Sequence, residues 1–210
     1  MITQKDHSGI WSNDYVPFTS TKDEVREMMA DLGTFSIETD KIRIEGYPYK
    51  PPVAYGSIEL FHQNIINIDV SKRPLTVRTG DELIFVPASE IEKLSRFALA
   101  NQIPFIERDD VWSWLLGPFL DSEYTEETHQ KLAALLSAYG LSETQVRLTS
   151  KEVAIQMFKY NFDTMLWEWC SLGSDDVLRA MRVKYNSEEF LHFYRRAMSI
   201  CLLPDEFGNT

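Results

Sequence analysis

Cysteine is scarce in this sequence: only Cys170 and Cys201 occur, both in segments with helical periodicity. This usage is typical of a reducing compartment and excludes a scaffold held together by disulfides, so we expect two buried free thiols. A thiol nucleophile would need a histidine partner and an electropositive, accessible setting, whereas tryptophan, methionine and isoleucine lie close to the two cysteines in the sequence. The sequence therefore predicts no catalytic cysteine.

Glycine-rich loops are also missing. The nine glycines are isolated from one another, and neither G-x-G-x-x-G nor G-x-x-x-x-G-K-[ST] occurs, which excludes nucleotide binding through those phosphate loops. The G-x-S-x-G, H-E-x-x-H and C-x-x-C motifs of common hydrolases and metal sites are absent as well. We expect no cofactor.

Positive charge is in short supply. The chain has 21 lysines and arginines against 32 aspartates and glutamates, a net charge of −11. Nucleic-acid binding normally requires a basic stripe that neutralises phosphates, so no nucleic-acid partner is expected; an acidic surface favours basic partners. Lys72 and Arg73 share one hairpin tip and Arg78 lies about 16 Å along the strand. We interpret these three cations as solvated turn charges that do not converge within the hairpin.

No long hydrophobic run is present. Residues 1–17 never build the apolar stretch of about 7–15 residues that a secretory signal needs. The richest segment, residues 157–172, is interrupted by polar residues well short of the roughly 18 apolar residues of a membrane span. We therefore expect a soluble, cytoplasmic protein without a signal peptide and without a membrane partner.

The apolar material that is present, 44% of 210 residues, suffices for a sizeable core. Thr21 and Glu24 form a capping box, so a short helix should run to about Leu32 and end at Gly33. Because residues 83–86 are apolar at consecutive positions, the strand that contains them should be covered on both faces. Period-2 alternation and turn signals predict six short strands in all, at residues 35–38, 41–45, 55–61, 65–70, 75–78 and 82–86.

A second capping box, Ser89 and Glu92, predicts a helix to about Asn101 that buries Leu94 and Phe97. Six antiparallel strands followed by this helix predict a curled sheet or partial barrel, capped by the helix. The element order over residues 33–102 is similar to pleckstrin-homology-like domains of bacterial type, with one strand fewer than their usual seven. The resemblance implies a fold and no activity.

From residue 109 onward the pattern is helical, and short connections imply antiparallel neighbours in a bundle. Two capping boxes, Ser142/Gln145 and Thr149/Glu152, begin two of the helices, and Ser187 is a candidate N-cap for the last. The expected fold class is α+β, with a β-rich domain and its capping helix at residues 1–104 and a helical domain at residues 105–210, packed together as one unit. The helices are expected at residues 111–120, 126–139, 142–148, 151–170, 175–183 and 188–202.

Two Glu-x-x-His pairs, Glu126/His129 and Glu189/His192, have the spacing that di-iron carboxylate bundles use. His129 shares a helix face with leucines, but His192 shares its face with charged residues and should face water. Both glutamates also fall in first turns, where the helix dipole favours them. We expect no metal site.

The segment 160–169 combines aromatic residues with a polar stripe. Asn161, Thr164 and Glu168 fall on one helical face, with Trp167 and Trp169 nearby. One interpretation is a core helix whose polar seam is satisfied by neighbouring helices. The other is a recognition pocket or subunit seam, since tryptophan and tyrosine are common interface anchors.

Apolar residues continue nearly all round the helix expected at residues 151–170, with Val153, Phe158 and Phe162 on one face. A helix of this kind should be buried on more than one side, with both of its tryptophans removed from water.

The lack of a nucleophile–base or metal-ligand arrangement favours a non-catalytic binding or regulatory protein that acts through contact with a partner protein or with itself. The alternative is an enzyme whose site is assembled from scattered residues of the helical half, such as Glu168, Asn161 and a histidine. A concave pocket that holds Glu168 beside an imidazole would favour the enzyme.

Overall fold

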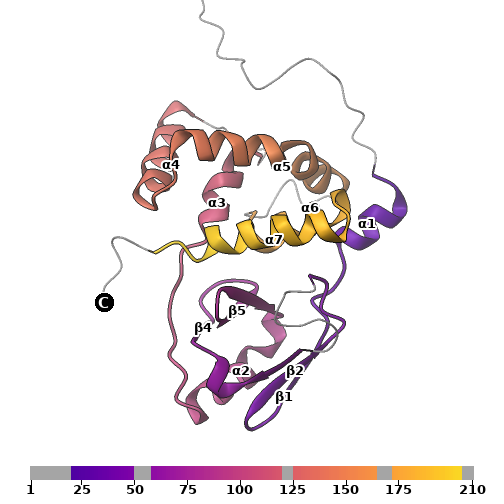
Figure 1. The fold of residues 1–210 in the computed structure, drawn as a ribbon, viewed down its shortest axis with the longest axis vertical. Coiled ribbons are helices and arrows are strands. Elements are labelled where there is room, and N and C mark those ends of the chain that lie inside the picture. The colour runs from indigo at the N-terminus through magenta and orange to yellow at the C-terminus, as the bar shows by residue number, and fades with distance from the viewer. Residues whose placement is uncertain (1–19, 50–57, 120–124, 165–171, 205–210) are drawn as a thin grey trace, which may run out of the picture.

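The computed structural model describes residues 20–49, 58–119, 125–164 and 172–204. These residues form an α+β fold in which most helices lie in one layer and the strands, with helix α2, lie in the other (Figure 1). One continuous cluster of buried apolar residues runs through both layers. None of the helices in the described ranges is long and apolar enough to cross a membrane.

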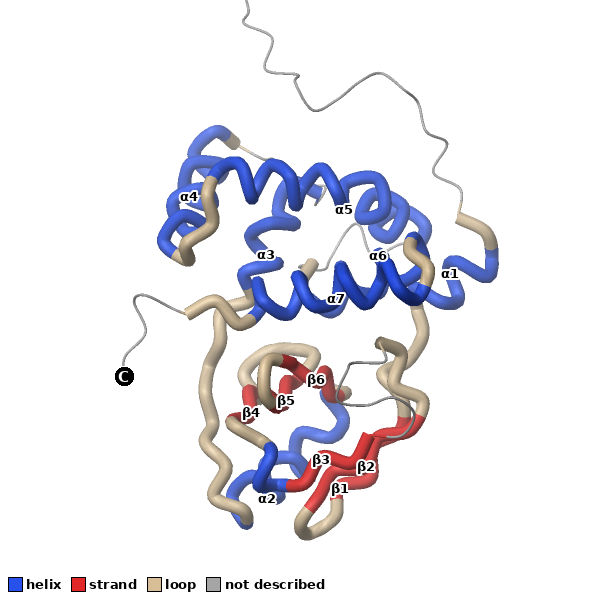
Figure 2. The backbone as a smooth tube through the Cα atoms, viewed as in Figure 1, coloured by secondary structure: helices blue, strands red, loops and turns tan. Residues whose placement is uncertain are grey.

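The six strands form two three-stranded antiparallel sheets (Figure 2). The single six-stranded curled sheet expected from the sequence is therefore not found among the described strands. A 3-10 turn, His62–Asn64, follows the last strand of the first sheet. The first sheet has the order β1 (Thr34–Ile37), β2 (Lys41–Glu45), β3 (Ile58–Phe61), and the second has the order β4 (Asn67–Asp69), β5 (Leu75–Thr79), β6 (Glu82–Val86).

The physical reason for the split is competition for one strand edge. The Ile68 N–H of β4 donates to the Pro104 carbonyl, and the Ile68 carbonyl accepts from the Ile106 N–H. This segment, which follows α2, therefore occupies the edge of β4 that a continuous sheet would offer to β3.

Strand β6 is buried at all five of its positions, as its apolar run predicts. Helix α7 (Ser187–Cys201) lies against it, and the Leu83 N–H points at the Met198 sulfur 3.4 Å away. Helix α2 (Ile91–Ala100) lies beside β1 and buries Leu94 and Phe97, which confirms the predicted capping helix.

The predicted capping box at the start of α2 is wrong. A 3-10 turn, Ala88–Glu90, leads into the helix, and the N-cap is Glu90, without a side-chain cap hydrogen bond. The 3-10 turn supplies hydrogen bonds of its own at this end, because the Glu90 N–H donates to the Pro87 carbonyl.

In the helical half, the two helices expected at residues 142–148 and 151–170 are a single helix over the described range, α5 (Glu143–Asp163). The capping box at Ser142 forms, whereas Thr149 lies inside the helix. Threonine and serine disfavour a helix interior only weakly, and burial of Val153, Met157 and Tyr160 outweighs that preference. The remaining helices are α3 (Val111–Leu116), which continues as the 3-10 turn Gly117–Phe119, α4 (Glu126–Ala138) and α6 (Ser174–Lys184).

The N-cap of α7 is Asn186 and not Ser187. The Asn186 side chain accepts hydrogen bonds from the N–H groups of Glu188 and Glu189, and Glu189 completes a capping box. Asparagine one residue earlier reaches these donors, which leaves Ser187 as the first helical residue.

Helix α1 (Lys22–Met28) begins with the predicted capping box at Thr21 and ends earlier than Leu32. Although it comes first in the chain, α1 packs on α6 and α5 in the helical layer (Figure 1). Gly33 then turns the chain toward β1 with a φ of +91°, and a Cβ there would lie 2.4 Å from the Glu45 carbonyl oxygen. The division into domains near residue 104 stays a prediction.

Buried polar side chains add hydrogen bonds inside each layer. Inside the helical layer, the Trp112 indole N–H of α3 donates to the Ala197 carbonyl of α7, and Trp112 is 1% exposed. The Tyr47 hydroxyl accepts from the Phe85 N–H of β6 at 2.8 Å, which ties the loop after β2 to the second sheet. Cys201 is a buried free thiol, as predicted, while Cys170 lies outside the described residues.

Candidate functional site

The polar stripe predicted on α5 is only partly within the described residues. Asn161 is 2% exposed, and its amide donates to the Phe119 carbonyl at 3.0 Å. The Thr164 hydroxyl donates to the Tyr160 carbonyl one turn earlier. Both polar groups thus serve backbone carbonyls inside the fold, as in the core-helix interpretation; Trp167, Glu168 and Trp169 lie outside the described residues.

The burial expected nearly all round α5 is wrong for two of its apolar residues. Ile155 is 55% exposed and Phe162 is 47% exposed. The helix lies at the outside of the layer, with neighbours on the side of α3, α4, α6 and α1. The burial predicted for Trp167 and Trp169 stays a prediction.

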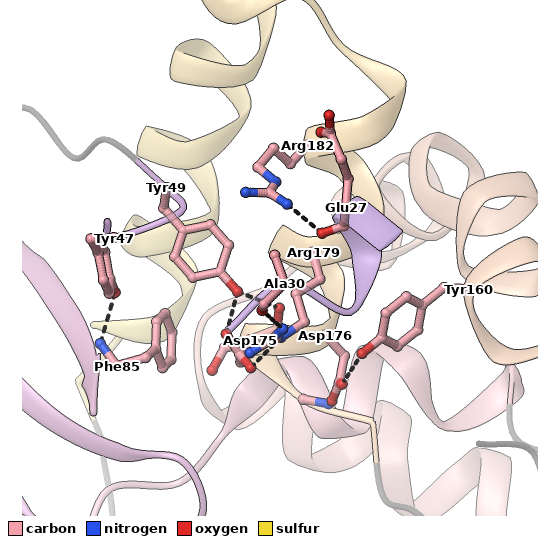
Figure 3. A network of polar contacts seen from close by, with 12 residues as sticks. Glu27, Ala30, Tyr47, Tyr49, Phe85, Tyr160, Asp175, Asp176, Arg179 and Arg182 are labelled. Carbon is pink, nitrogen blue, oxygen red and sulfur yellow. Dashed lines mark hydrogen bonds and ion pairs between the residues drawn. The ribbon is translucent and has the colours of Figure 1, made fainter. Parts of the chain in front are cut away.

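A polar network joins the start of α6 to the rest of the molecule (Figure 3). Asp175 accepts from the Tyr49 hydroxyl and from the Arg179 Nε, the latter at 2.7 Å. Arg179 also donates to the Ala30 carbonyl after α1, and Arg182 donates to the Glu27 carbonyl of α1. Two segments distant in the sequence, residues 27–30 and the loop that contains Tyr49, are therefore fastened to one helix.

Two further carboxylates complete this region. Asp176 accepts from the Tyr160 hydroxyl of α5 at 2.8 Å and from the Gly173 N–H. Burial, together with the neighbouring Asp175 charge, raises the pKa of Asp176 to about 6. Asp110 accepts from Ser174, and burial raises the pKa of Asp110 above its ordinary value.

This network stabilises the fold by joining separate segments of the chain. The carboxylates already accept from tyrosine, arginine or backbone donors, so their oxygens are committed to holding segments together. Burial raises the pKa of Tyr49 well above its ordinary value, which keeps its hydroxyl protonated as a donor. We find no nucleophile paired with a base in this network.

The histidine pairs do not form a cluster. Among the described residues, no group of three histidine, cysteine, aspartate or glutamate side chains has an arrangement that could hold a metal ion.

A groove of about 400 Å³ lies between α5 and α7. These two helices run across the helical layer with α3 packed against both (Figure 1). The floor contains Trp112 and Phe193, both buried. The apolar walls come from Leu141, Leu148, Ala197, Ile200 and Leu203.

Leu148 is the exposed apolar residue of this wall, with 56% of its surface in contact with solvent. It lies on α5, and Ile200 near the end of α7 and Leu203 just after it line the same groove. An exposed leucine beside a concave apolar surface is a typical feature of a site where apolar groups are buried on binding.

Five of the residues that line the groove are polar, and two of them form an ion pair. Glu152 of α5 accepts from Arg196 of α7 and from the Tyr185 hydroxyl, which spans the groove with an ion pair. Gln145, Thr149 and Ser199 add neutral polar groups. The arrangement offers an apolar surface with a polar rim and no reactive side chain.

The sequence did not predict the groove between α5 and α7. Its lining residues come from α3, α5, α7 and the loops beside them, so no local pattern joins them. The one available signal was Leu148, which is apolar at a position of α5 that should face solvent once residues 143–163 are recognised as one helix.

No family model, no curated protein and no solved structure matches the chain. The resemblance to pleckstrin-homology-like domains therefore rests on element order alone.

Proposed function

We propose that this chain is a non-catalytic binding protein whose groove between α5 and α7 receives an amphipathic helix of a partner protein. The observation that carries the proposal is the apolar groove of about 400 Å³ with the exposed Leu148 at its edge. Its volume falls in the range of about 300–1,000 Å³ that is typical of binding pockets. A groove between two helices also matches the way in which amphipathic helices dock through residues spaced by three and four.

Charge around the groove supports an acidic partner. The two stretches that border it, residues 143–152 and 195–203, contain Arg147, Lys151, Arg195 and Arg196 but only two carboxylates, Glu143 and Glu152. This local excess of positive charge stands out in a chain of net charge −11. A helix with glutamate or aspartate beside its apolar stripe would be attracted here and oriented by these cations.

Among the described residues, no pocket places Asn161 beside a histidine, as the enzyme alternative would require. The Asn161 amide is engaged by the Phe119 carbonyl inside the core. The groove itself is lined by an ion pair and neutral polar groups. We therefore retain the binding function expected from the sequence and assign it to a different surface.

The experiment uses a designed peptide, because the partner is unidentified. A fluorescent peptide of about 20 residues carries leucine at positions i, i+3, i+4 and i+7 and glutamate elsewhere, so that it forms an acidic amphipathic helix. A second peptide has lysine in place of glutamate. Fluorescence anisotropy should show saturable binding of the acidic peptide, weakened by salt, and weaker binding of the basic one.

Two matched variants locate the binding surface. Leu148→Glu should weaken binding of the acidic peptide by about tenfold or more, because it replaces an apolar contact at the edge of the groove with a carboxylate that repels the acidic peptide. Leu99→Glu changes a leucine that is 71% exposed on α2, outside the groove, and should leave affinity unchanged. Equal effects of the two substitutions, or a preference for the basic peptide, would contradict the proposal.

Self-association is distinguished by mass. Sedimentation equilibrium of the wild-type chain and of Leu148→Glu should give the same molecular mass. If the wild type is a dimer that Leu148→Glu dissociates, the occupant of the groove is a second copy of this chain and the partner-helix proposal is wrong.

A further inference from the structure

A second, smaller cavity lies where the second sheet meets the helical layer. It is half-enclosed, has a volume of about 40 Å³ and is separate from the groove. Its lining combines β5 and β6 with the segment before α3, the first residue of α6 and the end of α7. Among the lining residues are three cations, Lys72, Arg73 and Arg108, and three carboxylates, Asp69, Asp109 and Asp110.

The carboxylates of this cavity are already occupied by donors. Asp69 accepts from Ser71 at one oxygen and from the Arg108 N–H at the other. Asp109 accepts from the Tyr139 hydroxyl at 2.7 Å and lies 3.5 Å from the Lys72 ammonium.

Asp110 is engaged in the same way. Its Oδ1 accepts from the Trp112 N–H and its Oδ2 from Ser174. Each of the six carboxylate oxygens that line the cavity therefore has a donor within the fold.

Arg108 is the cation that is short of acceptors. One terminal nitrogen, Nη2, donates to the Asn67 side chain at 3.2 Å. The other, Nη1, is buried and has no hydrogen-bond partner among the described residues. A guanidinium nitrogen removed from water without an acceptor is costly, so an acceptor that enters the cavity would be stabilised.

The electrostatic surroundings of Arg108 also favour binding of an anion. Burial lowers the pKa of Arg108, and the nearby Arg78 guanidinium lowers it further, although Asp69 acts in the opposite direction. Lys72 and Arg73 line the same cavity, and the fold brings them to Arg108 even though they do not converge with Arg78 inside their own hairpin. Their side chains are half exposed or bonded to carbonyls nearby, so they add positive charge at the edge of the cavity.

We propose that this cavity binds a small oxyanion, a carboxylate or a phosphate group, through the buried Nη1 of Arg108, with Lys72 and Arg73 beside it. The volume of about 40 Å³ corresponds to roughly three water-sized spheres, which suits a carboxylate or the leading oxygens of a phosphate. Guanidinium groups bind both through charge-assisted hydrogen bonds. This inference is independent of the groove and of the partner proposed for it.

The test follows Arg108 directly in the ¹H–¹⁵N spectrum of the full chain, through its Nε–H resonance. Sodium phosphate and sodium acetate are titrated separately at constant ionic strength, with sodium chloride as the reference salt. We expect a saturable shift of the Arg108 resonance with a dissociation constant of about 1–10 mM for at least one of the two anions. The anion that binds more tightly identifies the source as phosphate or carboxylate.

Two variants and one control separate the site from a general salt effect. Arg108→Lys keeps the charge and loses the Nη1 donor; its binding is followed through the Nε–H resonance of Arg73, which also lines the cavity, and should be weakened by about tenfold or more. Arg73→Gln at the edge of the cavity should weaken it by about threefold or more while leaving the Arg108 core contacts in place. Arg26→Lys, on the exposed face of α1 with 78% of its side chain in solvent, should change nothing.

A shift of Arg108 that grows linearly with either salt, or that is matched by Arg26, would overturn the proposal and leave water as the occupant of the cavity. An Arg73→Gln variant that binds both anions as the wild type does would overturn the assignment to this cavity, even if Arg108→Lys fails to fold. Loss of peptide binding in the groove does not bear on either result.

Discussion

Asp176 links protonation to folding at the scale of a single residue. Its carboxylate is buried between Tyr160 and the start of α6, and burial raises its pKa from an ordinary value of 3.8 to about 6. Between these two pH values the folded chain keeps a proton that the unfolded chain releases. The stability that this group contributes is therefore fully present below about pH 4 and is lost as the pH rises through about 6.

The substitution Asp176→Asn removes this titration and keeps the size of the side chain. We expect the unfolding free energy of the variant, relative to the wild type, to rise by about 2–3 kcal/mol between pH 4 and pH 7. Chemical denaturation of both proteins across that range gives the difference directly. If the variant only lost a hydrogen bond, its unfolding free energy would be shifted by the same amount at every pH. Parallel curves of unfolding free energy against pH for the two proteins would therefore show that the pKa of Asp176 is not raised.

Phe97 tests the packing of the capping helix. It is 4% exposed on α2, and Phe97→Ala should cost about 3–5 kcal/mol of unfolding free energy because it leaves a cavity in the core. Leu99→Ala on the same helix is the control, since Leu99 is 71% exposed and should cost less than about 0.5 kcal/mol. A loss below about 1 kcal/mol for Phe97→Ala in chemical denaturation would refute the burial of this helix face.

At the scale of elements, α5 shows which signals in the sequence are strong. Local chemistry predicted its start, because the Ser142 capping box is complete within four consecutive residues. The predicted break near Thr149 rested on an equally local pattern and was wrong, because side chains distant in the sequence bury the inner face of the helix. A capping-box pattern inside an amphipathic segment is therefore a weaker signal for a helix start than continued burial of apolar side chains is for an unbroken helix.

Proline substitution distinguishes one helix from two. Ser150→Pro should cost about 3 kcal/mol or more in a continuous α5, because the ring removes an interior hydrogen bond and clashes with the preceding turn. If a helix instead began at Thr149, residue 150 would be its first helical position, where proline is well tolerated.

Glu143→Pro is the matched control for this prediction. Glu143 is the first residue of α5, and Ser142 before it is already extended, with φ −68° and ψ 153°. Proline should therefore cost little there. Thermal or chemical unfolding in which Ser150→Pro is as stable as Glu143→Pro would contradict the single helix.

At the scale of the whole molecule, the sequence predicts what depends on neighbours in the chain. The six strand positions, the burial of β6 and the α+β class follow from periodicity and turn residues. The separation of β3 from β4 into two sheets did not follow, because it depends on residues 104–106, which come after α2 and occupy the edge of β4.

The candidate site was less predictable than the fold for the same reason. The sequence predicted a candidate site at residues 161–169, where aromatic residues are dense. The groove is instead lined by Trp112, Leu148 and Ile200, which come from three separate helices. The cavity beside Arg108 likewise exists only because residues 69–73 and 108–110 are brought together, and Nη1 of Arg108 has no hydrogen-bond partner in the described part of the chain. Sites built from long-range contacts leave no local motif to find.

Intermolecular NOEs between the acidic amphipathic peptide and methyl-labelled protein test most directly whether the groove between α5 and α7 binds an amphipathic helix. We expect NOEs from peptide leucines to the methyl groups of Leu148, Ile200 and Leu203, which line the groove. We expect none to Leu99, which is exposed on α2 in the other layer. Peptide contacts that fall on Leu99 or elsewhere outside the groove, with Leu148 untouched, would contradict binding in the groove.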